Sequence, residues 1–217
     1  MHTREMRLRQ TILDTLAFEP SIDASRIRVI VVDDIVTLFG EVCSYAEKIA
    51  ADSAVQQIKG VRGIKQEIQV KCPKHRECGD DQIAERVRNI LAWDVSLPAD
   101  MVRVTVERGW VTLSGQVAWN FQKLAAADAV RRLSGVTGIT NAIAVQPCRD
   151  VTGIKDRIEA ALRRTAELNA RRIRVEVVGG WVRLEGSVDA WYKRGVAERA
   201  AWAASGVTSV ENCLTVR

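Results

Sequence analysis

The sequence predicts an α+β protein built from three tandem copies of one small domain, and three observations support that prediction. The segment VTLSGQV at 111–117 recurs as VTLFGEV at 36–42 and as VRLEGSV at 182–188. A glycine in each segment is followed 20 residues later by a second glycine that precedes a valine. An apolar pattern of helical spacing comes before each hairpin. Spacing that is kept three times indicates an internal repeat.

The repeat sets the expected domain boundaries. A chain of 217 residues suits two or three domains. We expect domains at 4–71, 79–146 and 150–217, the first of them divergent, with linkers at about 72–78 and 147–149. A unit of this size has a thin core, so the copies are expected to pack on one another.

Each copy begins with a helix and a hairpin. Apolar residues at helical spacing, such as Ile83, Val87 and Leu91, predict the first helix, with Asp81 and Thr152 as N-caps in the second and third copies. The segments IRVIV, VRVTV and IRVEV alternate with period two and predict half-buried first strands. A short turn follows each of them, so strands one and two form a hairpin.

A second helix and a third strand complete each copy. The helix carries small apolar residues on one face, such as Ala126 and Ala129, which let it lie close to the sheet. The expected unit is α-β-β-α-β, a three-stranded mixed sheet with two helices on one face. Six glycines are expected to fix its turns, the first of each pair at the strand-to-helix turn and the second as a left-handed C-cap. The pairs are Gly40 and Gly60, Gly115 and Gly135, and Gly186 and Gly206.

Bulk properties bound the function. The net charge of +5 permits weak attraction to anionic surfaces but does not require it. No apolar run approaches the roughly 18 residues of a membrane span. The N-terminal segment lacks the features of a secretory signal, so the protein as written is expected to be cytoplasmic.

The combined pattern resembles the BON domain, a family named for osmotically inducible and nodulation-related bacterial proteins. VTLSGQV with GVTGITNAIAV and VRLEGSV with GVTSVENCLTV are close matches. VTLFGEV with GVRGIKQEIQV is looser, with Gln66 where the others carry Asn141 and Asn212. The resemblance covers nearly the whole chain.

The resemblance implies a non-catalytic module without a cofactor. Members of the family are usually periplasmic or associated with the outer membrane, are linked to osmotic and envelope stress, and bind phospholipid. A cytoplasmic relative with one such domain is regarded as a potassium sensor. Three copies and the missing export signal set this chain apart from the periplasmic members.

Enzymatic chemistry is not expected. The two histidines, His2 and His75, lie near no repeated acid or nucleophile, and the pair Asp33–Asp34 is interpreted as hairpin turn chemistry. Cys72, His75 and Cys78 in the first linker have a spacing that could begin a zinc site, but a polar linker is the preferred interpretation.

Nucleic acid is an unlikely partner on the sequence. GVRG at 60–63 and GVTG at 135–138 fit the G-x-x-G of KH domains, but that loop joins two helices and this one joins a helix to a strand. The third copy lacks the second glycine. The mild positive charge is the main support for such a role.

Tryptophans give the sharpest candidates for a binding site. Trp191 and Trp202 are 11 residues apart and share a face of the third copy's second helix, with Arg194 and Arg199 on its flank. Either this face contacts a membrane or a protein partner, or the neighbouring repeat covers it.

A second aromatic pattern involves the hairpins. Trp110 and Trp181 begin the second strands of their copies, on the face that also carries a recurrent arginine of strand one. Those arginines are Arg28, Arg103 and Arg174. A structural Arg–Trp stack is expected, with a repeated anion-contacting surface as the alternative.

The sequence therefore predicts a non-enzymatic bacterial stress protein that binds anionic phospholipid or a protein partner. Potassium sensing is the alternative function.

Overall fold

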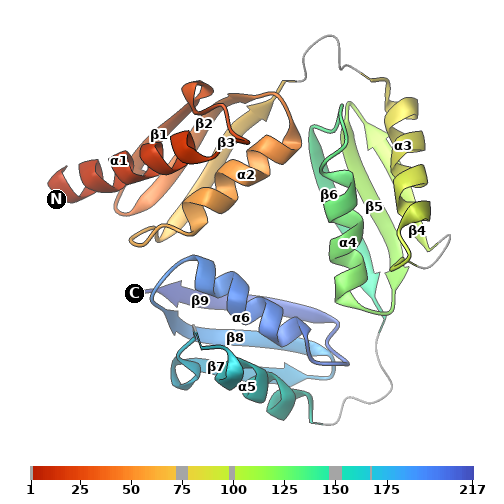
Figure 1. Cartoon of the computed structure of the whole chain (residues 1–217). Helices are drawn as coiled ribbons and strands as arrows, with labels where there is room; N and C mark the ends of the chain where they lie inside the picture. The colour runs from red at the N-terminus through yellow and green to blue at the C-terminus, as the bar shows by residue number, and fades with distance from the viewer. Residues whose placement is uncertain (1, 72–77, 98–100, 147–152, 167) are drawn as a thin grey trace.

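In the computed structural model the chain forms three domains of one topology (Figure 1). The structure describes residues 2–71, 78–97, 101–146, 153–166 and 168–217. In every domain a helix precedes a two-stranded hairpin, and a second helix and a third strand follow it. The α-β-β-α-β unit predicted from the repeat is therefore confirmed.

The elements of the three domains occupy corresponding places. The first domain contains α1 (His2–Phe18), a 3-10 turn (Ala24–Arg26), β1 (Ile27–Val32), β2 (Ile35–Val42), α2 (Tyr45–Gln56) and β3 (Gly63–Val70). The second contains α3 (Asp80–Trp93), β4 (Val102–Glu107), β5 (Trp110–Val117), α4 (Asn120–Val130) and β6 (Gly138–Val145). The third contains α5 (Ile154–Arg164), a 3-10 turn (Ala170–Arg172), β7 (Ile173–Val178), β8 (Trp181–Val188), α6 (Tyr192–Trp202) and β9 (Ser209–Val216).

Each sheet is mixed, with the second strand of the domain in its centre. In the first domain β2 pairs antiparallel with β1 and parallel with β3, and the other two sheets repeat that order. Asp33 and Asp34 both have left-handed φ angles, 51° and 64°, which the tight turn of a two-residue hairpin requires. The interpretation of this acidic pair as turn chemistry is confirmed.

Alternating apolar residues build each core between the sheet and its two helices. Val36, Leu38 and Val42 of β2 are buried against the apolar faces of α1 and α2, which lie on the same side of the sheet. Ile83, Val87 and Leu91 of α3 are buried as their spacing predicts. Burying one such side chain contributes roughly 1.5–3 kcal/mol, so these faces fix the helices on the sheet.

The first glycine of each pair lies inside the central strand and not at the strand-to-helix turn that the sequence suggested. Gly40, Gly115 and Gly186 have φ angles of 137°, 136° and 126°, and two strand residues follow each of them. A Cβ atom at any of the three would lie 2.0 Å from a carbonyl oxygen just before the neighbouring first strand. The repeat therefore keeps a glycine because the backbones approach too closely for a side chain.

The expected helix caps also need correction. The second helices end four or five residues before Gly60, Gly135 and Gly206, so these glycines form left-handed turns beyond the helix ends. Gly79, not Asp81, is the N-cap of α3. The neighbouring Asp80 carboxylate instead accepts hydrogen bonds from two N–H groups of the β4–β5 turn, at 2.7 and 2.8 Å. Thr152 lies outside the described residues.

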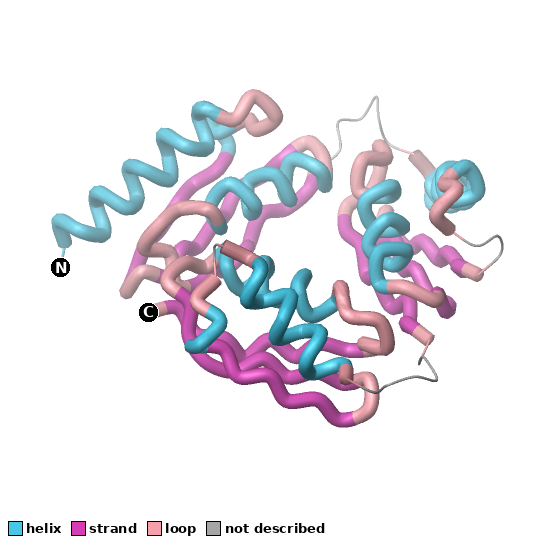
Figure 2. The backbone as a smooth tube through the Cα atoms, turned by 60° about the horizontal axis from the view of Figure 1, so that its bottom comes forward, coloured by secondary structure: helices cyan, strands magenta, loops and turns pink. Residues whose placement is uncertain are grey.

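The three domains surround a common centre. The second helix and third strand of each domain lie on the inner side of this arrangement (Figure 1), and the view in Figure 2 shows the same grouping. The second helix therefore lies on the side of each domain that is nearer the other two, while the first helices of the second and third domains lie toward the outside.

Aromatic residues at helix ends pack on the middle domain from both sides. Tyr45, the first residue of α2, packs on the core of the middle domain, where its hydroxyl bonds to the backbone of Ile139. Trp202, the last residue of α6, packs on the cores of both the third and the middle domains. Between the third and first domains, Asp189 interacts electrostatically with Lys59. Two joints therefore contain partly buried aromatic rings, and at the third a carboxylate lies near a lysine.

Candidate binding surfaces

The basic and aromatic pair that the sequence singled out in the third domain forms an internal stack. The Arg194 guanidinium lies over the Trp191 ring, 4.5 Å from its centroid, and its Nη2 donates to the carbonyl oxygen of Asn212 at 3.0 Å. Both side chains are half-buried. A cation–π contact that also has a hydrogen bond holds Trp191 against its own domain.

Trp202 lies at the joint between the middle and third domains. It borders a cavity of about 220 Å³ that Trp119 and Val145 line from the middle domain and Val207 from the third. At the joint between the first and middle domains, burial raises the pKa of the Tyr45 hydroxyl, because burial disfavours the charged phenolate. Arg199 is exposed on α6. The role of these third-domain residues toward a lipid or a partner stays a prediction.

The expected Arg–Trp stack across the hairpins does not form. Strand register pairs Arg103 with Ser114, four residues from Trp110, and pairs Arg174 with Glu185 in the same way. The Trp110 ring covers Gly138 instead, and its Nε1 donates to Thr140 Oγ1 at 2.8 Å. The prediction failed because both residues share a face of the sheet but lie at opposite ends of the hairpin.

The largest unpredicted feature is an apolar surface at the start of α4. Trp119, Phe121 and Leu124 are 50%, 57% and 48% exposed, and we call them the α4 surface. Gln122, Ala126 and Val130 occupy the buried face of the helix, so Phe121 and Leu124 lie off that face and point outward. Lys123 lies between Phe121 and Leu124 and places a positive charge beside them.

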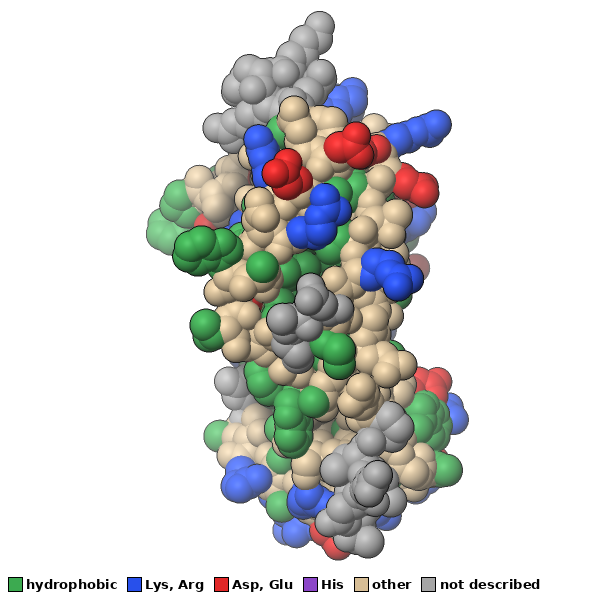
Figure 3. All heavy atoms as spheres, turned by 90° about the vertical axis from the view of Figure 1, so that its right-hand side faces the viewer, with side chains coloured by type: hydrophobic (Ala, Val, Ile, Leu, Met, Phe, Trp, Pro, Cys, Tyr) green, Lys and Arg blue, Asp and Glu red, His purple; other side chains and the backbone are tan. Residues whose placement is uncertain are grey.

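The end of α3 extends this apolar region. Gln122 Nε2 donates to the carbonyl oxygen of Ser96 at 2.8 Å, which holds the segment after α3 beside the start of α4. Trp93 and Val95 of that segment are strongly exposed. Figure 3 shows the outer side of the middle domain, where hydrophobic side chains lie among Lys and Arg side chains.

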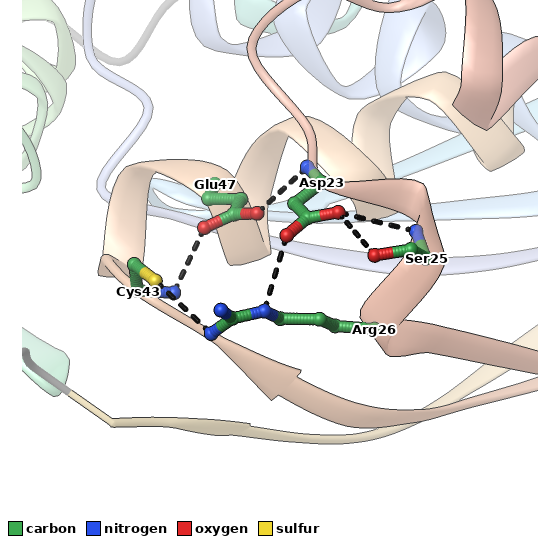
Figure 4. A network of polar contacts seen from close by, with 5 residues as sticks. All are labelled: Asp23, Ser25, Arg26, Cys43 and Glu47. Atoms are coloured by element: carbon green, nitrogen blue, oxygen red, sulfur yellow. Dashed lines mark hydrogen bonds and ion pairs between the residues drawn. The ribbon is translucent and has the colours of Figure 1, made fainter.

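A carboxylate is built into the start of α2 in the first domain. Glu47 Oε1 accepts from the backbone N–H of Asp23 at 2.9 Å, and its Oε2 accepts from that of Cys43 at 2.8 Å (Figure 4). Asp23 in turn accepts from Ser25, which lowers the pKa of the Asp23 carboxyl. Arg26 pairs with Asp23 at 3.1 Å and donates to Cys43 Sγ. Glu47 thus ties the loop after α1 to the start of α2.

Of the three residues of the predicted zinc site, the structure describes one. Cys72 and His75 lie outside the described residues, while Cys78 accepts a hydrogen bond from Arg86 Nη1 at 3.1 Å. Among the described residues, no group of three or more His, Cys, Asp or Glu side chains could hold a metal ion. None of the helices described here is long and apolar enough to cross a membrane.

One side-chain tie recurs in all three domains. Asn141 Nδ2 donates to the carbonyl oxygen of Lys123 at 2.7 Å, and Asn212 Nδ2 donates to that of Arg194 at 2.9 Å. Gln66 makes the corresponding bond to Lys48 at 3.1 Å with its longer side chain. The polar residue of each third strand thus holds the first turn of the second helix.

The repeated fold, its strand glycines and this tie agree with a family comparison. The model of the BON domain matches three times, at residues 5–72, 79–147 and 150–217. The chain belongs to the BON domain family.

Similarity to individual proteins is more distant. Osmotically-inducible protein Y of Escherichia coli (strain K12) is 27% identical over 146 residues, which cover 64% of this chain and 73% of that protein. Two structures of CdsD, a structural protein of the type III secretion system of Chlamydia trachomatis, also align. They are 15% and 14% identical with TM-scores of 0.27 and 0.28, and cover 97% and 96% of this chain and 92% and 96% of theirs. Neither informs the arrangement of the three BON domains here.

Sequence reasoning missed the α4 surface of the middle BON domain although a signal was present. The helical pattern of this copy identified its buried alanine face, and Phe121 and Leu124 fall off that face. Large apolar residues on the unburied side of a helix indicate either a joint or an exposed patch. The position of Glu47 was also missed, because its role depends on a loop 24 residues earlier in the chain.

Proposed function

We propose that this BON protein is a non-enzymatic binding protein of the osmotic stress response which attaches to anionic phospholipid surfaces through the α4 surface. The exposure of Trp119, Phe121 and Leu124 on one helix start is the observation that supports this function. Exposed apolar residues gathered in this way mark an interaction site more often than singly scattered ones do.

The chemistry of these side chains suits a membrane interface. Tryptophan and phenylalanine bury large apolar area at the boundary between head groups and acyl chains, and the indole N–H can still find a polar partner there. Each ring that enters the interface contributes roughly 1.5–3 kcal/mol. The net charge of +5 adds a weak long-range attraction to anionic lipid.

The stress association rests on the similar protein from Escherichia coli, whose name describes it as osmotically inducible. The third-domain residues Trp191, Arg194 and Arg199 form the second possible contact region, and Trp202 is half-buried at a joint. We place the main contact on α4 because its rings are more exposed than Trp191.

Vesicle flotation tests the proposal. We expect Trp119→Ala with Phe121→Ala to reduce binding to vesicles of phosphatidylglycerol and phosphatidylethanolamine by at least about tenfold, since two inserted rings are lost. Phe18→Ala removes an 89% exposed ring from the first domain and serves as the matched control, which should bind as the parent does. Trp191→Ala tests the third-domain alternative in the same assay.

The outcomes separate the candidate functions. If the folded α4 variant binds vesicles as well as the parent, the α4 assignment is wrong, and loss only in Trp191→Ala would move the contact to the third domain. If none of the proteins floats with vesicles, lipid attachment is wrong. A rise in melting temperature in potassium but not in sodium at equal ionic strength would then favour ion sensing, by mass action on the folded state.

A further inference from the structure

The second helices of the three domains differ at one position near their starts. Glu47, Gln122 and Lys193 correspond to one another under the repeat. In the first domain Glu47 accepts two backbone N–H groups and closes the loop onto the helix. In the middle domain Gln122 Oε1 accepts from Ala118 and Trp119, while its Nε2 donates to Ser96. Both side chains fill the space between loop and helix.

The third domain has a lysine at the position where the other two domains have a hydrogen-bond acceptor. An ammonium group carries only donors, so Lys193 cannot accept the backbone N–H groups that Glu47 accepts. Lys193 instead pairs with Asp189 at 2.7 Å, and its hydrogen bond lowers the pKa of that carboxyl. A cavity of about 900 Å³ lies between the end of α5, the loop before β7, the end of β8 and the start of α6.

The lining of this cavity is both basic and apolar. Arg163, Arg171, Arg172 and Lys193 supply positive charge, and only Glu159 and Asp189 oppose it. Arg163 pairs with Glu159 at 2.9 Å, whereas neither Arg171 nor Arg172 forms an ion pair or side-chain hydrogen bond with any described residue.

Apolar side chains form another part of the wall, beside the polar residues Asn169 and Ser187. Leu162, Ile173 and Val188 line the same cavity. Its volume falls within the range of small-molecule pockets, roughly 300–1,000 Å³, which usually combine apolar walls with a few placed polar groups.

We infer that this cavity binds a small amphipathic organic anion, whose carboxylate or phosphate group takes the place that the Glu47 carboxylate occupies in the first domain. The Glu47 carboxylate is a negative group already bound by backbone N–H groups at the corresponding place. Lys193 and the two unpaired arginines supply charge-assisted hydrogen bonds to such an anion. The Asp189 side chain is 67% exposed and can leave Lys193 when the anion enters.

This inference goes beyond the proposed attachment to lipid and concerns a different domain. The α4 surface is an exposed helix face of the middle domain, whereas this site is a cavity of the third. Failure of one assignment therefore leaves the other standing, because vesicle flotation tests the first and NMR titration tests the second, with different variants.

NMR titration tests the inference, with phenyl phosphate as the probe. It is added to the isotope-labelled full chain at about 150 mM salt, which screens non-specific attraction between charges. We expect saturable shifts of the backbone amides of Asn169 and Arg172 and of Asp189 and Lys193. Inorganic phosphate should bind at least about tenfold more weakly because it lacks the apolar part, and benzyl alcohol should not saturate because it lacks the charge.

Variants locate the site. Lys193→Glu restores the carboxylate of the first domain and should abolish phenyl phosphate binding. Arg171→Ala with Arg172→Ala should weaken it at least about tenfold, and both residues are exposed, so this variant should fold in any case. Arg174→Ala, an exposed arginine on β7, is the matched control and should bind as the parent does.

Several results would overturn the inference. They are equal binding by the folded Lys193→Glu or double arginine variant, equal affinity for inorganic phosphate, and no saturation by phenyl phosphate in the parent. A last titration uses phosphatidylglycerol vesicles in place of phenyl phosphate. If they shift the cavity amides and phenyl phosphate does not, the cavity recognises a lipid head group on a membrane and not a soluble anion.

Discussion

At the scale of single residues, the strand glycines explain why the repeat is so regular. Gly115 lies in the central strand with φ of 136°, opposite Val102, and the carbonyl oxygen of Met101 occupies the place of a Cβ atom. Such a backbone conformation is costly for any residue with a side chain, and the close approach adds a clash that the backbone can relieve only by moving a strand.

Replacing this glycine tests that explanation. We expect Gly115→Ala to destabilise the middle domain by about 3 kcal/mol or more, because strain and overlap act together. Thermal melts followed by circular dichroism measure the loss. Gly79→Ala is the control, since its φ is −65° and an added Cβ meets nothing within 4 Å. Equal melting temperatures for both variants would show that the strand tolerates a side chain.

The sequence revealed which glycines matter but not where in the fold they lie. Their spacing is visible in the chain, whereas the contact that requires Gly40 is with the carbonyl oxygen of Arg26, across the sheet. An alternation that stops at a glycine therefore looked like the end of a strand. Tertiary pairing carries the strand two residues further, to Val42.

At the scale of elements, a side-chain hydrogen bond joins the third strand of each domain to the second helix. Apolar packing alone would let the helix shift along the sheet. Asn141 donates to the carbonyl oxygen of Lys123, and its Oδ1 accepts from the N–H of Ile143 at 3.3 Å. One side chain thus fixes the height of α4 along β6. The periodic pattern predicted both elements but could not predict their relative height, which this polar contact sets.

Removing this amide should loosen the helix without unfolding the domain. We expect Asn141→Ala to cost about 1–2 kcal/mol in the free energy of unfolding, since two part-buried hydrogen bonds are lost. Urea titration measures the change. Thr105→Ala, an exposed residue on β4, should change stability by no more than about 0.5 kcal/mol. A neutral effect of Asn141→Ala would mean that packing alone places α4.

The same limit explains the missed α4 surface. Periodicity separates the buried side of a helix from the other side, and it placed Ala126 and Val130 correctly. Whether Phe121 on the remaining side meets solvent or a neighbouring domain depends on how three domains pack. For α6 the same reasoning left two alternatives open, and in the structure Trp202 lies at a joint.

At the scale of the whole molecule, unequal joints connect the three domains. Tyr45 and Trp202 bury aromatic rings against the middle domain, whereas the contact identified between the first and third domains is that of Asp189 with Lys59. Exposed charge pairs contribute little and are screened by salt. The joint between the terminal domains should therefore open first, while the middle domain keeps both neighbours.

Trp202→Ala should release the third domain from the middle one. Removing a half-buried ring at a joint costs about 3 kcal/mol, and the covalent linker between β6 and α5 then becomes the main connection between these domains. We expect a larger radius of gyration by small-angle scattering and separate melting of the third domain by calorimetry. Trp93→Ala, which removes an 86% exposed ring, should leave both unchanged.

High salt should increase the radius of gyration of the Trp202→Ala variant further, because screening then weakens the remaining contact between the third and first domains. If the folded variant stays as compact as the parent at every salt concentration, the ring of Trp202 does not hold the joint.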